Sequence, residues 1–197
     1  MKNDLVVIVD MVNGFVNFGT LADKKINDIT PGIEKLVQIA KKKGIKIVAF
    51  KDCHSMEDEE FKTYPPHCLK GSSESELVPE LKKYEKDFLS INKNTTNGFI
   101  TNTFQNIISK YDFDNVYVVG CCTDICVKDF ALSYQAYLKK EGKKTNIIVF
   151  SDLVATFDSP SHGAKEFGEN ALQEMKTVGI KVVESGLNAK KTDEMNK

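Results

Sequence analysis

Three residues whose types could together cleave an amide or ester each follow a short apolar run of the chain. Asp10 follows LVVIV, Lys93 follows LSIN, and Cys126 comes shortly after the run VYVV stops at Gly120. A cysteine needs help as a nucleophile because only a few per cent of it is thiolate at neutral pH. An aspartate can accept the thiol proton, and a lysine can stabilise the anions that form. These residues predict a cysteine nucleophile, with Asp10 as its base and Lys93 as its counter-charge.

Each of the three residues also has an ordinary structural explanation. Asp10 could cap a helix, Lys93 could be a solvated surface charge, and Cys126 could be a small buried hydrophobe. Their joint placement at the carboxyl ends of strands favours chemistry, because parallel sheets build their sites there. Cys126 would lie in the first turn of a helix that begins near Thr123 or Asp124, where free N–H groups favour a thiolate.

A second group of polar residues lies in the next stretch of the chain. Asp52 and His54 alternate along an extended segment and can share one face, and His67 follows two prolines that stiffen its backbone. Imidazole and carboxylate are ligands for zinc, iron or manganese, and Glu60 could add a fourth ligand. The alternative is a surface loop whose polar side chains bond only to one another.

The composition excludes several classes of protein. The chain of 197 residues is 41% hydrophobic and 28% charged, which suits one globular domain. Its net charge of −1 argues against nucleic-acid binding, and it has neither a membrane-length apolar run nor an apparent signal peptide. The cysteines form no disulfide framework or paired zinc pattern, so we expect a reduced, cytoplasmic setting. They are Cys53, Cys68, Cys121, Cys122 and Cys126.

Apolar runs and helix-like segments alternate along the whole chain, which predicts an α/β fold around a parallel sheet. Strands are expected at 5–9, 45–50, 87–91, 116–119, 146–150 and 180–183. Helices are expected at 31–43, with Thr30 as the N-cap, and at about 74–83, 102–110, 124–140 and 160–177.

The chain divides into one expected domain and a tail. Residues 1–187 form the domain, which includes a long loop at 51–73, and residues 188–197 form a polar tail. His162 follows a helix-start signal and is interpreted as structural. The vicinal pair Cys121-Cys122 is interpreted as packing, because vicinal cysteines rarely form a comfortable disulfide.

Taken together, these motifs resemble the isochorismatase-like cysteine hydrolases, and within them the nicotinamidase branch. The resemblance implies a three-layer αβα sandwich around a six-stranded parallel sheet. It also implies hydrolysis of nicotinamide to nicotinate and ammonia in NAD salvage, through a cysteine thioester. Relatives that work without metal lack the histidine pattern. The segments that carry the resemblance span nearly the whole domain: VIVDMVNGF, DCH, EFKTYPPHCLKG, INKNTTNGF and VVGCCTDICV.

The resemblance assigns the reacting groups residue by residue. It implies a catalytic triad of Asp10, Lys93 and Cys126. A cis peptide would join Cys121 to Cys122, so that the backbone N–H groups of Cys122 and Cys126 form an oxyanion hole. Phe15 and Tyr64 would sandwich the pyridine ring of the substrate, beside Cys121.

The same resemblance implies one divalent metal ion. Its ligands would be Asp52, His54 and His67, with Glu60 at a position that some members use as a further ligand. Zinc is the expected metal, with iron or manganese as alternatives, and it would bind the pyridine nitrogen of nicotinamide. No nucleic acid or membrane partner is implied, and a homo-oligomer is compatible with the family.

Three positions depart from the family pattern. The segment NGF at 13–15 replaces Asn-Asp-Phe, Cys122 replaces an alanine near the oxyanion, and Cys53 stands where an aromatic residue is common. These changes leave two alternatives open. One is a hydrolase of another small amide or carbamoyl compound, and the other is a catalytically silent redox-sensing or interaction protein.

Overall fold

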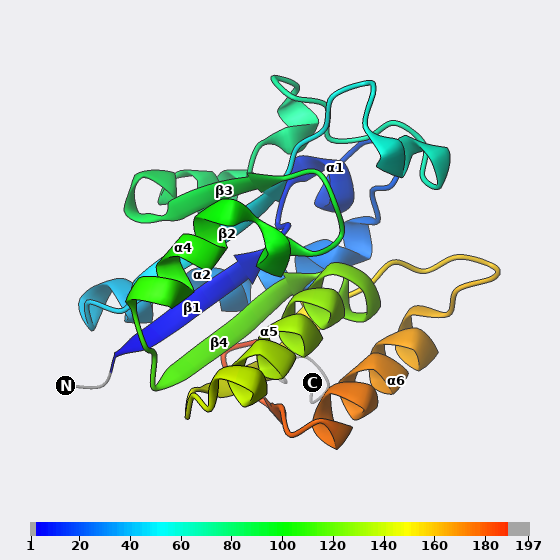
Figure 1. Cartoon of the computed structure of the whole chain (residues 1–197). Helices are drawn as coiled ribbons and strands as arrows, with labels where there is room; N and C mark the ends of the chain where they lie inside the picture. The colour runs from blue at the N-terminus through cyan, green and yellow to red at the C-terminus, as the bar shows by residue number, and fades with distance from the viewer. Residues whose placement is uncertain (1–2, 189–197) are drawn as a thin grey trace, which may run out of the picture.

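Six parallel strands form one sheet in the order β3-β2-β1-β4-β5-β6. Figure 1 labels β3, β2, β1 and β4, which lie side by side. The structure is a computed structural model, described here over residues 3–188. The strands are β1 (Asp4–Val9), β2 (Lys46–Asp52), β3 (Leu89–Lys93), β4 (Asn115–Cys121), β5 (Asn146–Ala155) and β6 (Lys181–Val183). The α-helices are α1 (Asn13–Val16), α2 (Thr30–Lys42), α3 (Pro79–Lys82), α4 (Asn102–Lys110), α5 (Lys128–Glu141) and α6 (Ala164–Thr177).

Helices cover both faces of the sheet, because alternate side chains of a strand point to opposite sides. Leu5 and Val7 of β1 belong to the core cluster that α4, α5 and α6 complete. Val6 and Ile8 belong to the second cluster, which α2 covers from behind in Figure 1. The predicted three-layer αβα sandwich around a six-stranded parallel sheet is therefore confirmed.

The strand register aligns the polar residues at the carboxyl edge of the sheet. Asp52 and Lys93 end β2 and β3 and are direct partners across these strands. In β1, Val9 pairs with Phe50 on one side and with Gly120 on the other. Asp10, which follows Val9, therefore lies between the ends of β2 and β4.

The strands agree with the sequence prediction, and the helix boundaries differ in places. All six strands and the helix at 102–110 are confirmed, although β5 runs on to Ala155. Thr30 does not cap α2 as expected. A 3₁₀ segment at Lys24–Ile29 leads directly into α2, so Thr30 is already helical.

Three predicted helices are interrupted or shortened. The helix expected at 74–83 is a 3₁₀ turn at Ser73–Ser75 followed by α3, because Val78 is extended before Pro79. The helix expected at 124–140 begins as a π-helical turn at Thr123–Val127 before α5. The helix expected from residue 160 begins only at Ala164, after a tight turn.

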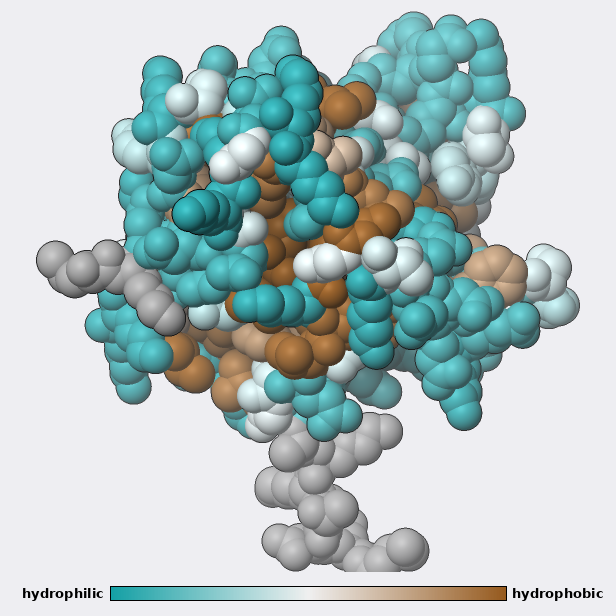
Figure 2. Space-filling view, turned by 60° about the horizontal axis from the view of Figure 1, so that its bottom comes forward, coloured by the Kyte–Doolittle hydropathy of each residue, from teal (hydrophilic) through white to brown (hydrophobic). Residues whose placement is uncertain are grey.

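The surface carries scattered apolar residues. Figure 2 shows apolar side chains gathered in the middle of one face, framed by polar ones. The large hydrophobic side chains that are exposed include Phe18, Met56, Leu89, Ile100, Tyr111, Phe167 and Val183.

Within residues 3–188, no helix has both the length and the apolar character needed to cross a bilayer. Homo-oligomerisation stays a prediction, and the predicted tail at 188–197 lies, beyond Asn188, outside the described residues.

Gly120 generates the first testable prediction. Its φ is +116°, and a Cβ at this position would lie 2.0 Å from the carbonyl oxygen of Val9. Gly120→Ala therefore forces β4 away from β1. We expect it to lower the free energy of unfolding by about 2 kcal/mol or more, measured by chemical denaturation.

Gly44→Ala is the matched control. Gly44 also has a positive φ, +66°, but nothing lies within 4 Å of the added Cβ. Its cost is limited to the left-handed conformation, about 1 kcal/mol. Equal losses in the two variants would show that the close approach to Val9 does not matter.

Candidate active site

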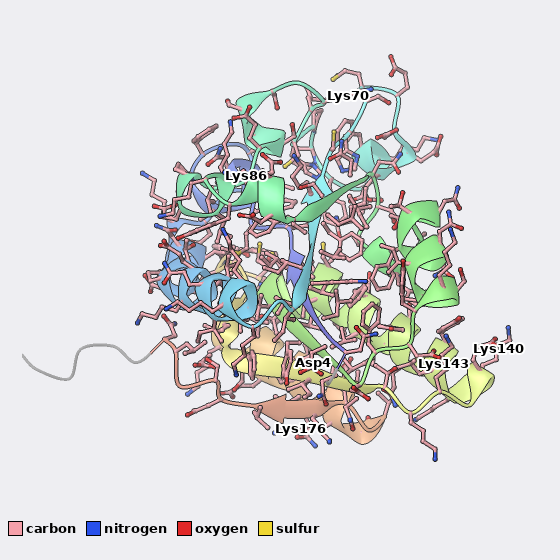
Figure 3. All side chains as sticks on the ribbon, turned by 90° about the vertical axis from the view of Figure 1, so that its left-hand side faces the viewer. Asp4, Lys70, Lys86, Lys140, Lys143 and Lys176 are labelled. Atoms are coloured by element: carbon pink, nitrogen blue, oxygen red, sulfur yellow. The ribbon has the colours of Figure 1, made fainter. Side chains whose placement is uncertain are left out.

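A buried lysine joins the polar residues at the carboxyl edge. The Nζ atom of Lys93 lies 2.8 Å from Asp10 Oδ2, 2.8 Å from Asp52 Oδ1 and 3.9 Å from Cys126 Sγ. The labelled lysines in Figure 3, such as Lys70 and Lys140, lie at the periphery, whereas Lys93 is only 3% exposed. A solvated surface charge is therefore excluded as the explanation of Lys93.

The two carboxyl groups beside Lys93 have different pKa values. Burial raises the pKa of Asp10 to about 6, although the positive charge of Lys93 opposes the shift. Burial also disfavours the charge of Asp52, but Lys93, His54 and His67 outweigh it and lower the pKa of Asp52. Burial disfavours the charged form of Lys93, yet Asp10 and its neighbours raise the lysine pKa well above its usual value. Lys93 is thus an ammonium between an ionised Asp52 and an Asp10 that can exchange a proton near neutral pH.

The carboxylate oxygens of Asp10 are available to accept a proton. It is fully buried, and its φ of +48° lies in the left-handed region. Among the described residues, no well-aligned hydrogen-bond donor satisfies either carboxylate oxygen, although Lys93 is close. Unsatisfied buried oxygens are costly, which favours a functional reason for leaving them open.

Cys126 is the fourth residue of the π-helical turn at Thr123–Val127, and it lines a cavity. Burial raises the pKa of its thiol well above the usual value, although Lys93 lowers it. The start of the helix therefore does not suffice by itself to hold a thiolate in the resting site, which agrees with the predicted need for Asp10 as a base. The resting thiol keeps its proton, so a base is needed when the sulfur reacts.

The peptide between Cys121 and Cys122 is cis. The Cys121 thiol donates to the carbonyl oxygen of Asp10 at 3.1 Å, and the side chain is fully buried. The Cys121 side chain turns back toward β1 and is not among the cavity-lining residues, so a contact of Cys121 with substrate stays a prediction. Cys122 lines the cavity beside Cys126. The oxyanion hole formed by the N–H groups of Cys122 and Cys126 stays a prediction.

Asp52, His54 and His67 form a cluster that fits a metal ion. All three are buried, and their potential ligand atoms lie within 4.8 Å of one another. The Nε2 atoms of both histidines lie 3.0 Å from Asp52 Oδ2. Because these side chains are buried, the alternative of an exposed surface loop is excluded for them.

The outer ring nitrogens of the two histidines support this assignment. His54 Nδ1 lies 3.1 Å from Asp58 Oδ2, and His67 Nδ1 donates to the carbonyl oxygen of Pro65 at 2.8 Å. Metal-binding histidines show the same arrangement, because a bond at the outer nitrogen fixes the ring and its tautomer. Each Nε2 atom lies within hydrogen-bond distance of the Asp52 carboxylate, so a cation bound here would take the place of a proton between nitrogen and oxygen.

Glu60 lies outside this cluster. Of the residues described, only Asp52, His54 and His67 come within 4.8 Å as a group. Glu60 is half-buried, and burial raises its pKa. It lines the cavity together with His67, so its role as a further ligand stays a prediction.

The cavity has a volume of about 650 Å³ and connects the cluster with the nucleophile. Phe15, Tyr64 and His67 line it, and so do Cys122 and Cys126. The ring of Phe15 lies 5.6 Å from that of His67, and the ring of Tyr64 lies 6.4 Å from it. The predicted aromatic residues are thus brought to the place where a flat ring could bind, whereas Cys53 is not among the lining residues.

The sequence reasoning missed residues that support the site. Asp58 orients His54, and its spacing of four residues from His54 was the available signal. Asp124 bonds to His162 at 2.7 Å, which nothing in the local sequence suggested. Phe157, Asp158 and Ser159 line the cavity from the segment between β5 and α6.

Known proteins resemble this chain along nearly its whole length. Nicotinamidase 1 of Arabidopsis thaliana is 35% identical over 178 residues, which cover 81% of this chain and 72% of that protein. The structure of pyrazinamidase of Pyrococcus horikoshii in complex with zinc has a TM-score of 0.75 and 27% identity, and covers 92% of this chain and 99% of its own. N-carbamoylsarcosine amidase of Thermoplasma acidophilum has a TM-score of 0.76 and 25% identity, with both chains fully covered.

The sequence also matches the description of a protein family. Residues 4–186 match the isochorismatase domain, which is most of the 197 residues. The match includes every strand of the sheet and every residue of the buried site described above. The chain therefore belongs to the isochorismatase domain family.

Proposed function

We propose that this protein is an amidase that hydrolyses nicotinamide to nicotinate and ammonia in NAD salvage. The observation that carries the proposal is the buried Lys93, which contacts Asp10 and Asp52 and lies 3.9 Å from the thiol of Cys126. The lysine thus links a nucleophile and its base to a metal-binding cluster at one cavity. The resemblance to the Arabidopsis nicotinamidase supports the choice of nicotinamide.

In the proposed reaction, Cys126 attacks the carboxamide carbon. Asp10 takes the thiol proton as the carbon–sulfur bond forms, and Lys93 stabilises the charges on both groups. The N–H groups of Cys122 and Cys126 hold the resulting oxyanion. Losing one such donor typically costs about 10²- to 10³-fold in rate.

The second half of the reaction releases the products. Asp10 returns its proton to the amide nitrogen, the carbon–nitrogen bond breaks, and ammonia leaves a thioester on Cys126. A water molecule then attacks the thioester carbon while Asp10 takes its proton. The carbon–sulfur bond breaks, nicotinate is released, and the sulfur of Cys126 recovers a proton.

Asp52, His54 and His67 would hold a divalent ion, with zinc proposed because of its preference for nitrogen and oxygen ligands. A bound ion would supply Lewis acidity toward the pyridine nitrogen of the substrate. Phe15 and Tyr64 orient the ring by contact with its faces. The carboxamide then points toward Cys126.

A second candidate is a hydrolase of a carbamoyl compound. It is favoured by the full-length structural match to N-carbamoylsarcosine amidase and by a cavity of about 650 Å³, which is generous for nicotinamide. The ratio of kcat/KM for nicotinamide to that for N-carbamoylsarcosine decides between the two candidates. A silent protein would show neither activity.

The first prediction of this function concerns the nucleophile. Cys126→Ala removes the attacking sulfur, so we expect ammonia release from nicotinamide to fall by at least about 10³-fold. Cys53→Ala is the matched control, since Cys53 is not among the cavity-lining residues, and should retain most of the activity. Substantial activity in folded Cys126→Ala, with unchanged circular dichroism, would refute the assignment.

The second prediction concerns pH. The pKa of Asp10 is raised to about 6, and only the ionised carboxylate can take the thiol proton. We therefore expect kcat/KM to fall as the pH drops through about 6, by about tenfold per unit below it. Metal content is measured at each pH to separate this effect from loss of the ion. A rate that stays flat down to about pH 5 would exclude Asp10 as the base.

The third prediction concerns the metal. Removing the ion with a chelator, or substituting His54→Ala, should raise KM for nicotinamide by about tenfold or more, because the ring loses its anchor. Added zinc should restore the chelated wild type and leave His54→Ala impaired. If KM is the same in metal-free and metal-loaded protein, the ion does not bind the substrate.

A further inference from the structure

A hydrogen bond joins the turn that carries Cys126 to the segment between β5 and α6. Asp124 lies in the π-helical turn at Thr123–Val127, and its Oδ2 atom is 2.7 Å from His162 Nε2. Its other carboxylate oxygen accepts a hydrogen bond from Thr156 Oγ1 at 2.5 Å. Both oxygens of Asp124 are therefore bonded to residues after β5.

The ring of His162 contacts two aromatic rings and a backbone carbonyl group. Its centroid lies 4.0 Å from that of Phe157, nearly parallel at 9°, and 4.0 Å from that of Phe167 on the other side. Its Nδ1 atom lies 3.0 Å from the carbonyl oxygen of Phe157. His162 thus contacts Phe157 through both its ring face and its backbone bond.

The segment that His162 holds is one wall of the cavity. Phe157, Asp158 and Ser159 line the cavity. They belong to no helix or strand. Ser159 and His162 exchange two backbone hydrogen bonds of 2.9 and 3.1 Å, which close a tight turn. Asp158 N–H donates to Asp23 Oδ2 at 3.0 Å, a second attachment at the rim.

We propose that His162 is a positioning residue that fixes the Phe157–Ser159 wall against the Cys126 turn through Asp124. The wall limits the size of what can reach the sulfur, so the hydrogen bond between His162 and Asp124 sets substrate affinity and size selectivity. His162 touches neither the cavity nor the reacting atoms, and it leaves the chemical step to the triad. For its substrate, this inference rests on the proposed hydrolysis of nicotinamide.

The first measurement is the kinetics of nicotinamide hydrolysis by His162→Ala and His162→Phe. The alanine loses both the ring contacts and the hydrogen bonds, whereas the phenylalanine keeps the stacking and loses only the bonds. We expect KM to rise about tenfold in the alanine variant, and less in the phenylalanine variant, with kcat within about threefold of the wild type. A fall in kcat at unchanged KM would overturn the proposal, because His162 would then act on the nucleophile.

Thr145→Val is the matched control for general destabilisation. Thr145 Oγ1 donates to the carbonyl oxygen of Phe113 at 2.6 Å, near the amino end of β5 and away from the cavity. The variant should lose stability without a change in KM. If it raises KM as His162→Ala does, the effect comes from instability and the proposal fails.

The second measurement does not depend on nicotinamide. Cys126 is alkylated with iodoacetamide and with the bulkier N-benzyl-iodoacetamide, and tandem mass spectrometry follows the Cys126 site. In His162→Ala we expect the ratio of the bulky to the small reagent's rate to rise about fivefold or more, because the wall has loosened. An unchanged ratio together with an unchanged KM would make His162 merely structural, even if thermal stability falls.

These two measurements separate the possible failures. If wild-type protein does not hydrolyse nicotinamide but the alkylation ratio changes in the variants, the proposed substrate is wrong and the role of His162 stands. If His162→Ala does not fold, Asp124→Asn keeps the size of the side chain and weakens the same bond. It should shift KM and the alkylation ratio in the same direction, and no shift in either would refute the proposal.

Discussion

The site depends on a single buried cation. Lys93 is an ammonium with almost no exposure to water, and such a charge is stable in a protein interior only when counter-charges pair with it. Asp10 and Asp52 provide them, each 2.8 Å from Nζ. Because Asp10 directly follows β1, and Asp52 and Lys93 end β2 and β3, the ion pairs form only when all three strands are in register. The lysine therefore couples the chemistry of the site to correct assembly of the sheet.

The same lysine gives the two carboxyl groups different properties. Asp52 also faces two histidines, so its charge is stabilised from two sides and its pKa falls. Asp10 is also paired with Lys93, but the negative charge of Asp52 opposes its ionisation, so burial prevails and its pKa rises to about 6. One carboxyl group is thus suited to remain an anion beside a metal, and the other to gain and lose a proton. Their difference arises from the neighbours on the far side of each group.

Much of this arrangement was accessible from the sequence, because the positions and the ends of the strands follow from local patterns. Apolar runs located every strand, and right-handed crossovers placed their carboxyl ends at one edge. That was enough to bring Asp10, Lys93 and Cys126 together. The turn at Cys126 was less accessible, because a π-helical turn has the same apolar pattern as an α-helix and differs only in its hydrogen bonds.

Contacts between segments far apart in the sequence could not be predicted from local patterns. His162 follows Pro160, and by local rules that position begins a helix. In the structure a backbone turn and the bond to Asp124 use those residues instead, and α6 begins at Ala164. Likewise, nothing local indicates that the Cys121 side chain turns toward the backbone of Asp10. In both cases the deciding partner lies many residues away.

The protonation of Cys126 explains why the cavity walls matter to the chemistry. Burial raises the thiol pKa, while Asp10 has a pKa of about 6, so moving a proton from sulfur to carboxylate is uphill in the resting site. The transfer becomes favourable only when the sulfur is forming a bond to a carbonyl carbon whose oxyanion is stabilised nearby. A thiol that keeps its proton reacts slowly with a molecule that the site does not hold in position. It reacts faster with a molecule that the cavity walls hold at the correct position. The low reactivity of the free thiol and the positioning of substrate by the walls therefore act together.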